Sequence, residues 1–596
     1  MSQTIDPVNQ LTFILPVEFV QQYENITPDW GFKGLSEFVC RRTYCRTSEK
    51  TGLPEEWYEI VERVVNCNFS MAKYHCISNG LTWNEKAEME EAKKMYDAIF
   101  HFRFTPPGRG LWANTPKLLF EKNLSAALNN CGFVSTQDID KEYSLPFRWA
   151  MEFSMLGVGI GFDVKGHNKL VIQDPIINST DESNYKPFVT SICQNQTYVD
   201  FLEAFKSNYS VDSQDQEIVK KSKANIHKLI DLLSTSICQE NVPLEQGSKQ
   251  NQHTCISDFY PNAKLPNDLE LRHFIIHFLD RFNNHEQPNT QEFAKLNYVT
   301  YLSNMFLTLQ NEILANGRLK EAILKQLIAD LKTKPNPDKT VTARDIPMLI
   351  QQYKDAVNSM GVKEQFEWLR DGKLYDYTLK SYYDDMCSYV YELLYLWNNF
   401  NTDFNVYTIE DTREGWVKAT GIALDTYLKK GQKPFLFDYV LIREKGIQLK
   451  TFGGLSSGPD PLCDLHLMLR HLLERKKGKL ITLTDITDIL NYIGKCVVAG
   501  NVRRTSEIGL GPPDSEEFLA LKDYTKNPHR AKWGWCSNNS VFAEIGMDYK
   551  KIADMIKNNG EPGLFYLDLC RAYGRLADPP NYKDCRVAGT NPCSIN

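Results

Sequence analysis

The sequence of 596 residues lacks any apolar stretch long enough to cross a bilayer. It also lacks a basic segment followed by an apolar run near its first residue, so we expect no signal peptide and a cytoplasmic location. A strong positive charge is absent as well, since the formal net charge is −7. This balance argues against electrostatic capture of nucleic acid or of an anionic membrane.

Paired cysteine motifs are lacking too. The chain has 15 cysteines, but none stand in a CxxC pair and none share with histidines a spacing typical of zinc ligands. A secreted disulfide framework would be denser and in a shorter chain. We therefore predict no metal site, and we expect most of these cysteines to be free and buried. The absence of CxxC also argues against a simple thiol–disulfide oxidoreductase.

Glycine is scarce in the middle of the chain. Residues 174–404 contain only four glycines: Gly247, Gly317, Gly361 and Gly372. Because glycine costs a helix about 1 kcal/mol relative to alanine, such a segment is expected to be helical. Apolar residues recur there at helical spacing, for example Ile226, Leu229, Ile230 and Leu233, and again Leu302, Met305, Leu309 and Ile313, with Gly317 placed to end the second helix. We predict a self-contained helical insertion over 174–404, of unknown role.

The flanking parts have a different pattern. After a mainly helical region at 1–100, short β-prone runs occur at Gly132–Thr136, Gly159–Val164 and Val497–Leu510, and a helix is expected at Thr484–Ile493. Strands that alternate with helices indicate an α/β sheet or barrel. We therefore predict one α/β body, formed by 101–173 and 405–596, that the helical insertion interrupts.

Three motifs before the insertion have candidate functional residues. PPGRGLW (106–112) predicts a rigid loop. LNNCGFVS (128–135) places Cys131 at the start of a strand, where a buried cysteine is the commoner interpretation. MLGVGIGFD (155–163) is spaced GxGxG and leads from a helix into a strand, so it is not a dinucleotide fingerprint. Its bare backbone could admit phosphate oxygens, or the glycines could simply pack tightly.

The last motif is AGTNPCS (588–594), near the end of the sequence. Glycine, asparagine and proline predict a turn that presents Cys593 on a rigid loop, a placement more typical of chemistry than of packing. A plain disulfide with Cys585, eight residues upstream, is the alternative.

Taken together, nine strings resemble, in order, the monomeric adenosylcobalamin-dependent class II ribonucleoside-triphosphate reductases. They are PPGRGLW, LNNCGFVST, MLGVGIGFD, DTREGWV, TFGGLSSGPDPL, GKCVVAGNVRRTSEIGLG, SNNSV, GEPGLF and AGTNPCS. The resemblance covers roughly 1–173 and 405–594, and it implies part of a ten-stranded α/β barrel with an N-terminal helical region and a large helical insertion. A loop through such a barrel has a radical cysteine at its tip.

The resemblance also implies roles for individual residues. Cys593 would hold the thiyl radical that takes the 3′ hydrogen of the ribose, and Cys131 would be the first thiol of the reducing pair. Asn591 would hydrogen-bond the substrate. Further substrate contacts are expected at Gly157, Gly159 and Asn130, and effector contacts at Asp163 and Lys165.

The cofactor implied is adenosylcobalamin, with its contacts expected mostly after the end of this sequence. The implied partners are a ribonucleoside triphosphate (or diphosphate) substrate, a deoxynucleoside triphosphate effector and a thioredoxin-like reductant.

One departure from the family pattern concerns the segment after Cys593. The pattern reads NPC-x-Glu, with the glutamate as acid/base, and here the corresponding residue is Ile595. We therefore expect the chain to be incomplete and inactive alone, with a separately encoded C-terminal part as one source of the remainder. The alternatives are the large subunit of a class I reductase and a catalytically inactive nucleotide-binding fragment.

Overall fold

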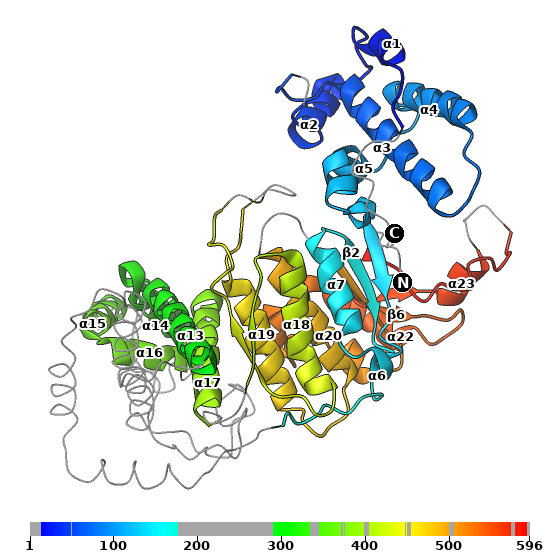
Figure 1. Ribbon diagram of the computed structural model, residues 1–596. Coiled ribbons are helices and arrows are strands. Elements are labelled where there is room, and N and C mark those ends of the chain that lie inside the picture. The colour runs from blue at the N-terminus through cyan, green and yellow to red at the C-terminus, as the bar shows by residue number, and fades with distance from the viewer. Residues whose placement is uncertain are drawn as a thin grey trace.

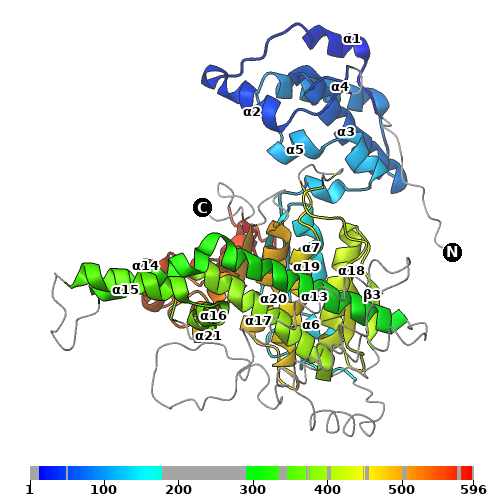
Figure 2. The ribbon, with the colours of Figure 1, turned by 90° about the vertical axis from the view of Figure 1, so that its left-hand side faces the viewer.

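The computed structural model describes residues 13–48, 51–176, 290–333, 345–370, 373–374, 376–398, 404–447, 449, 455–499, 506–573 and 579–592. Figure 1 shows three parts: an N-terminal helical lobe, a central α/β body and a group of insertion helices on the side of the body away from the sheet. Figure 2 shows the lobe above the body from a second direction. The helix predicted around Ile226–Leu233 lies outside the described residues. No helix in the described ranges is long and apolar enough to span a membrane.

The N-terminal lobe is built from helices that share an aromatic core. They are α1 (Val17–Val20), α2 (Leu35–Thr43), α3 (Trp57–Ser78), α4 (Glu85–Phe100) and α5 (Gly108–Ala113). A capping box starts α3, because the side chain of Glu56 accepts from the backbone of Glu59 while the Glu59 carboxylate accepts from the Glu56 amide. The buried Trp57 indole then donates to the carbonyl of Phe100 at 3.1 Å, which fixes α3 against α4.

The body contains a sheet of five strands, all parallel, in the order β1-β2-β5-β6-β7. Their bounds are Cys131–Val134, Gly159–Asp163, Glu507–Gly511, Ser537–Phe542 and Gly563–Phe565. In register, Cys131 lies opposite Gly159, and Ile160 opposite Glu507. The described strands form an open sheet, so the barrel implied by the resemblance is seen only as this parallel sheet.

Two of the three predicted strands are where the sequence places them, as β1 and β2. The third prediction, a β-prone run over Val497–Leu510, is wrong at its start. The preceding helix continues to Val498, and β5 begins only at Glu507. The β-branched residues Val497 and Val498 extend the last turn of that helix, because its apolar face packs on the body.

One face of the sheet is covered by helices, as parallel sheets require. Four of them stand side by side in Figure 1: α7 (Leu145–Met155), α18 (Arg413–Leu428), α19 (Asp460–Glu474) and α20 (Leu483–Val498). A capping box of Thr482 and Asp485 starts α20. Shorter helices complete the body: α6 (Ile139–Glu142), α21 (Glu516–Leu519), α22 (Lys550–Asn559) and α23 (Leu567–Ala572).

The described part of the insertion is helical, as predicted. It comprises α13 (Thr290–Leu314), α14 (Arg318–Thr333), α15 (Ile346–Ser359), α16 (Val362–Arg370) and α17 (Tyr377–Asn398). Helix α13 ends at Leu314, and a 3-10 turn follows over Ala315–Gly317, where Gly317 has a φ of +70°. A pair of parallel strands, β3 (Asn405–Thr408) and β4 (Phe435–Asp438), follows the insertion.

The described helices of the insertion share an apolar core with the body, and a self-contained insertion over 174–404 stays a prediction. Buried residues of α13, such as Leu302 and Phe306, belong to the same continuous apolar core as β4 and α19. Contacts run from α13 to β4 and from α17 to α19. The apolar stripes of these helices therefore face the body as well as each other.

A buried ion pair reinforces this junction. Arg470 of α19 and Glu392 of α17 are both fully buried, with Nε and Oε1 2.8 Å apart. Tyr298 of α13 donates its hydroxyl to the same carboxylate oxygen at 3.0 Å. The Arg470 guanidinium lies 3.9 Å from the ring centroid of Phe435 and donates to the carbonyl of Phe435. Helices α13, α17 and α19 thus all contribute to one buried ion pair and its hydrogen bonds.

A second buried acid lies under α20. Glu507 of β5 is 2% exposed, and Asn491 donates to its Oε2 at 3.1 Å. The carboxylate faces Gly494, where a Cβ would lie 2.5 Å from Oε1. Burial raises the pKa of Glu507 to about 8 from its ordinary 4.5, so its neutral form is favoured at pH 7.

Removing one partner of the buried ion pair should be strongly destabilising. We expect Glu392→Ala to lower the free energy of unfolding by about 3–5 kcal/mol, because Arg470 would be left buried and unpaired. The control is Glu321→Ala, which breaks an exposed pair with Lys325 and should leave the free energy of unfolding almost unchanged. Urea unfolding followed by circular dichroism measures both. Equal losses in the two variants would contradict the anchoring role of Glu392.

Glu507 should make stability depend on pH. The unfolded carboxyl ionises near pH 4.5 and the folded one near pH 8, so wild-type stability should fall across this interval. Glu507→Gln has no ionisation, and its stability relative to wild type should improve steadily between pH 4.5 and 8. Glu321→Gln, at an exposed acid whose pKa Lys325 lowers, should show no such gain. Parallel pH dependences for Glu507→Gln and wild type would contradict the raised pKa.

Candidate active site

The site is built on the sheet face opposite the helices. A Cβ placed on Gly159 would lie 3.0 Å from the Cys131 sulfur, 3.1 Å from the Ser506 hydroxyl and 3.5 Å from Cγ of Pro592. Strands β1 and β2, the residue before β5, and the segment just before Cys593 therefore meet at one point. A glycine is needed at position 159 because any side chain would occupy the space where these groups converge.

The chain crosses this face next to β2. A Cβ on Gly161 would lie 1.8 Å from the carbonyl oxygen of Thr590, which is far inside contact distance. Gly589 in turn lies against the ring of Phe133 and beside Leu510. Residues 588–592 thus lie directly on a strip of bare backbone. These contacts favour the tight-packing interpretation of the glycine motif, because the backbone at Gly159 and Gly161 faces protein atoms.

Two basic residues hold the approach to Cys593. Arg571 donates from Nε to the carbonyl of Val587 at 2.9 Å. Lys165 places its Nζ 3.5 Å from the carbonyl oxygen of Ala588 and 4.8 Å from the ring centroid of Phe542. The backbone of this segment is therefore fixed from both the β2 side and the α23 side.

Asp163 is fully buried at the end of β2, and its carboxylate is used within the protein. Oδ2 accepts from the Ser135 hydroxyl at 2.6 Å, and Oδ1 accepts from the amide of Thr136 at 2.9 Å and from that of Lys165 at 3.2 Å. These bonds tie the ends of β1 and β2 together. Both side chains contact other residues of this chain, Asp163 at Ser135 and Thr136 and Lys165 at Ala588. Effector contacts by Asp163 and Lys165 stay a prediction.

Arg109 is a site-supporting residue that the sequence analysis did not single out. It belongs to PPGRGLW, and its guanidinium donates to the carbonyls of Ala127 at 3.1 Å, Leu156 at 2.7 Å and Gly157. It therefore links α5 to the segments that enter β1 and β2. The available signal was an arginine between two glycines, but the predicted rigid loop is wrong for residues 108–112, which belong to helix α5. Ser506 was missed because serine inside a long motif has no distinctive spacing.

The remaining predicted site residues are placed only in part. Asn130 is exposed, and its carbonyl accepts from the amide of Gly159 at 2.9 Å. Asn591 is half-buried in the segment that lies on β2. Cys593 lies outside the described residues, so its disulfide with the exposed Cys585 is untested. Substrate contacts by Gly157, Gly159 and Asn130 stay predictions. Within the described ranges, no three His, Cys, Asp or Glu side chains are grouped so that they could hold a metal ion.

Filling the bare strip should displace the segment that lies on it. We expect Gly161→Ala to destabilise the fold by about 1–3 kcal/mol and to increase hydrogen exchange in residues 587–592, because the new methyl group overlaps Thr590. The control is Gly361→Ala, since a Cβ at Gly361 meets no atom within 4 Å and should change stability by less than about 0.5 kcal/mol. Unchanged exchange at 587–592 in Gly161→Ala would disprove the contact.

Two family descriptions match parts of this chain. Residues 15–115 match the ribonucleotide reductase alpha domain, and residues 374–473 match the insertion domain of B12-dependent ribonucleotide reductase. The second match crosses the boundary that we predicted between residues 404 and 405. It includes α17, α19 and the strands between them, and so it contains both partners of the buried Glu392–Arg470 pair.

Whole-chain comparisons agree with these matches. A probable adenosylcobalamin-dependent ribonucleoside-triphosphate reductase of Dictyostelium discoideum is 30% identical over 98% of this chain and 49% of its own length. The corresponding reductase of Euglena gracilis is 28% identical over the same shares, and that of Lacticaseibacillus paracasei is 44% identical over 31% of this chain and 25% of its own length.

A crystal structure of a B12-dependent (class II) ribonucleotide reductase matches the fold with a TM-score of 0.51, at 22% identity, over 98% of this chain and 56% of that one. The chain spans about half the length of the curated relatives that match nearly all of it. The family matches and the two long alignments show that this chain is similar, over its described and aligned parts, to the B12-dependent, class II ribonucleotide reductases.

Proposed function

We propose that this chain carries the substrate-reducing part of an adenosylcobalamin-dependent ribonucleoside-triphosphate reductase. The observation that supports this best is the convergence of Cys131, Ser506 and Pro592 around Gly159. Because Pro592 precedes Cys593 in the sequence, we propose that the thiol that the family pattern assigns to the radical lies close to Cys131, the thiol that the pattern assigns to reduction. Sulfur suits both tasks, because a thiol can lose a hydrogen atom and a thiol pair can deliver two electrons as it becomes a disulfide.

The proposed chemistry divides between the two cysteines. The sulfur radical of Cys593 takes the 3′ hydrogen atom of the ribose, and the 2′-hydroxyl then leaves as water. Cys131 and a partner thiol supply two electrons and two protons and become a disulfide. The hydrogen atom returns from Cys593 to C3′, which regenerates the radical. The tight contact of residues 588–592 with β2 supports this role, because a radical sulfur must be kept in one place and away from water.

The cofactor remains an expectation from the relatives. Adenosylcobalamin, which their names specify, would supply the radical that removes the hydrogen atom from the Cys593 thiol. The family pattern places most of the cobalamin contacts outside this sequence. The described residues do fit the tasks of holding the radical segment and presenting the reducing thiol.

The open sheet fits a larger closed structure. All five strands are parallel, and helices α7, α18, α19 and α20 cover one face. A parallel sheet is normally covered on both faces, and its edge strands are normally paired. We therefore propose that β1, β2, β5, β6 and β7 are part of the ten-stranded barrel. A deoxynucleoside triphosphate effector and a thioredoxin-like reductant are the proposed partners.

The class II assignment is favoured over a class I large subunit by a specific observation. The insertion-domain match belongs to the B12-dependent family, and it covers the segment anchored by Arg470. The names of the relatives likewise specify ribonucleoside triphosphates as substrates, and we propose the same substrate class here.

Two cysteine variants should separate the two proposed tasks in the native polypeptide that carries this sequence. Given adenosylcobalamin, a dithiol and a ribonucleoside triphosphate, Cys593→Ser should lose both deoxynucleotide formation and release of a 3′ tritium label, because no thiyl can form. Cys131→Ser should lose deoxynucleotide formation and keep part of the tritium release.

The control for this pair is Cys585→Ser, at an exposed position, which should leave both readouts near wild type. Substantial deoxynucleotide formation by Cys593→Ser would overturn the proposed function. Loss of activity in Cys585→Ser together with a Cys585–Cys593 disulfide in the wild-type protein would do so as well.

A further inference from the structure

A second pair of thiols lies far from the candidate active site, at the end of α2 in the N-terminal lobe. The carbonyl of Cys40 accepts two backbone hydrogen bonds, from the amide of Tyr44 at 2.8 Å and from that of Cys45 at 3.2 Å. This tight turn returns the chain onto itself and brings the two side chains together, so that the thiols hydrogen-bond each other. Both cysteines are free.

The two thiols of this pair differ in exposure and acidity. Cys40 is 5% exposed, whereas Cys45 is half-buried and can be reached from solvent. The hydrogen bond to Cys45, together with burial, raises the pKa of Cys40. The same hydrogen bond lowers the pKa of Cys45, because the Cys40 thiol stabilises the Cys45 thiolate. An accessible thiol with a lowered pKa beside a buried thiol is the arrangement found where one cysteine attacks and its neighbour resolves.

We propose that Cys40 and Cys45 form a redox-active pair, a site of reversible disulfide formation by exchange with a low-molecular-weight or protein disulfide. The Cys45 thiolate attacks one sulfur of that disulfide, which breaks the S–S bond, forms a mixed disulfide and expels the first thiolate. Cys40 then loses its proton and attacks the Cys45 sulfur. The Cys40–Cys45 bond forms, the second thiolate leaves, and two electrons have passed to the external disulfide.

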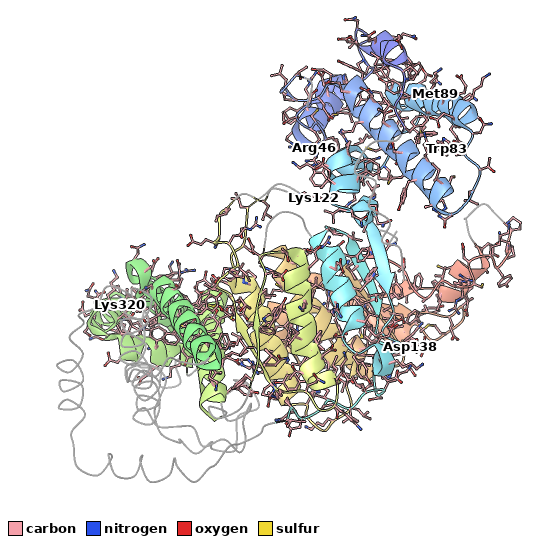
Figure 3. The ribbon with its side chains drawn as sticks, in the orientation of Figure 1. Arg46, Trp83, Met89, Lys122, Asp138 and Lys320 are labelled. Carbon is pink, nitrogen blue, oxygen red and sulfur yellow. The ribbon has the colours of Figure 1, made fainter. Side chains whose placement is uncertain are left out.

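The position of the pair gives its oxidation a structural consequence. The Tyr44 hydroxyl lies against Gly108, where a Cβ would be 2.6 Å away. Arg46, labelled in Figure 3, lies with its guanidinium 4.1 Å from the ring centroid of Trp112 and donates to the Trp112 carbonyl at 3.0 Å. Residues 44 and 46 therefore hold α5, which contains Arg109. A disulfide would fix the turn from which both contacts arise.

The test uses the full chain with its native fold, exposed to increasing ratios of oxidised to reduced glutathione. Thiols are then alkylated, and the peptides are identified by mass spectrometry. We expect Cys40 and Cys45 to be protected together and to be recovered as one intramolecular disulfide. Hydrogen exchange in residues 40–46 and 108–113 should slow in the oxidised protein, and the far-ultraviolet circular dichroism should not change.

Variants identify the order of attack. In Cys40→Ser, Cys45 should accumulate as a stable mixed disulfide with glutathione. In Cys45→Ser, Cys40 should stay reduced, because it is buried. Cys76→Ser, which removes a half-buried cysteine of α3, should leave formation of the Cys40–Cys45 disulfide unchanged. The proposal is overturned if wild-type protein stops at a glutathione adduct on Cys45, or if both thiols stay reduced while the exposed Cys585 is oxidised.

Discussion

The candidate active site depends on the absence of side chains from Gly159 and Gly161 on one face of β2. Gly159 and Gly161 leave room for the segment 588–592 to lie on the backbone of the strand, with the Thr590 carbonyl in the space that a Cβ on Gly161 would occupy. A single methyl group there would move the segment and the cysteine bonded to it. The surrounding contacts all maintain this arrangement, since Asp163 fixes the ends of β1 and β2 and Lys165 reaches the carbonyl of Ala588.

The rest of the molecule holds that strip in place from two directions. Arg109 links the N-terminal lobe to the carbonyls just before β2. On the other side of the sheet, α19 holds the insertion helix α17 against the body, because Arg470 of α19 pairs with Glu392 of α17 inside a shared core. The insertion is therefore positioned to influence the helices that support the sheet. The junction between the insertion and the body contains the buried Arg470–Glu392 ion pair and the hydroxyl of Tyr298, which donates to Glu392.

Local patterns in the sequence predicted local features correctly. The runs around Cys131 and Gly161 are strands, and the helix that starts at Thr290 ends at Leu314, just before the 3-10 turn that contains Gly317. The start of the next predicted strand was misplaced, because Val497 and Val498 have β-branched side chains yet form the last turn of α20. Propensity is a weak guide where tertiary packing decides the outcome.

Contacts between distant residues could not be predicted in this way. Gly161 and Thr590 are separated by more than four hundred residues. Only the fold shows that the carbonyl of Thr590 lies where a side chain at position 161 would be. The pairing of Glu392 with Arg470, which joins α17 to α19, could not be predicted either. Nor could the hydrogen bond from Arg109 to the carbonyl of Leu156. Motif order predicted the resemblance to the family, whereas the reason for Gly159 and Gly161 in MLGVGIGFD came from the packed structure.

The most direct test of this account is thiol-directed cross-linking of the native polypeptide in its Cys585→Ser form. A short bifunctional reagent joins two thiols only when both lie within its reach, and peptide mass spectrometry identifies them. The account predicts a dominant cross-link between Cys131 and Cys593, because Pro592 lies beside the same point of β2 as the Cys131 sulfur. If Cys593 is modified without any link to Cys131, the segment does not lie on the glycine strip, and the central claim is wrong.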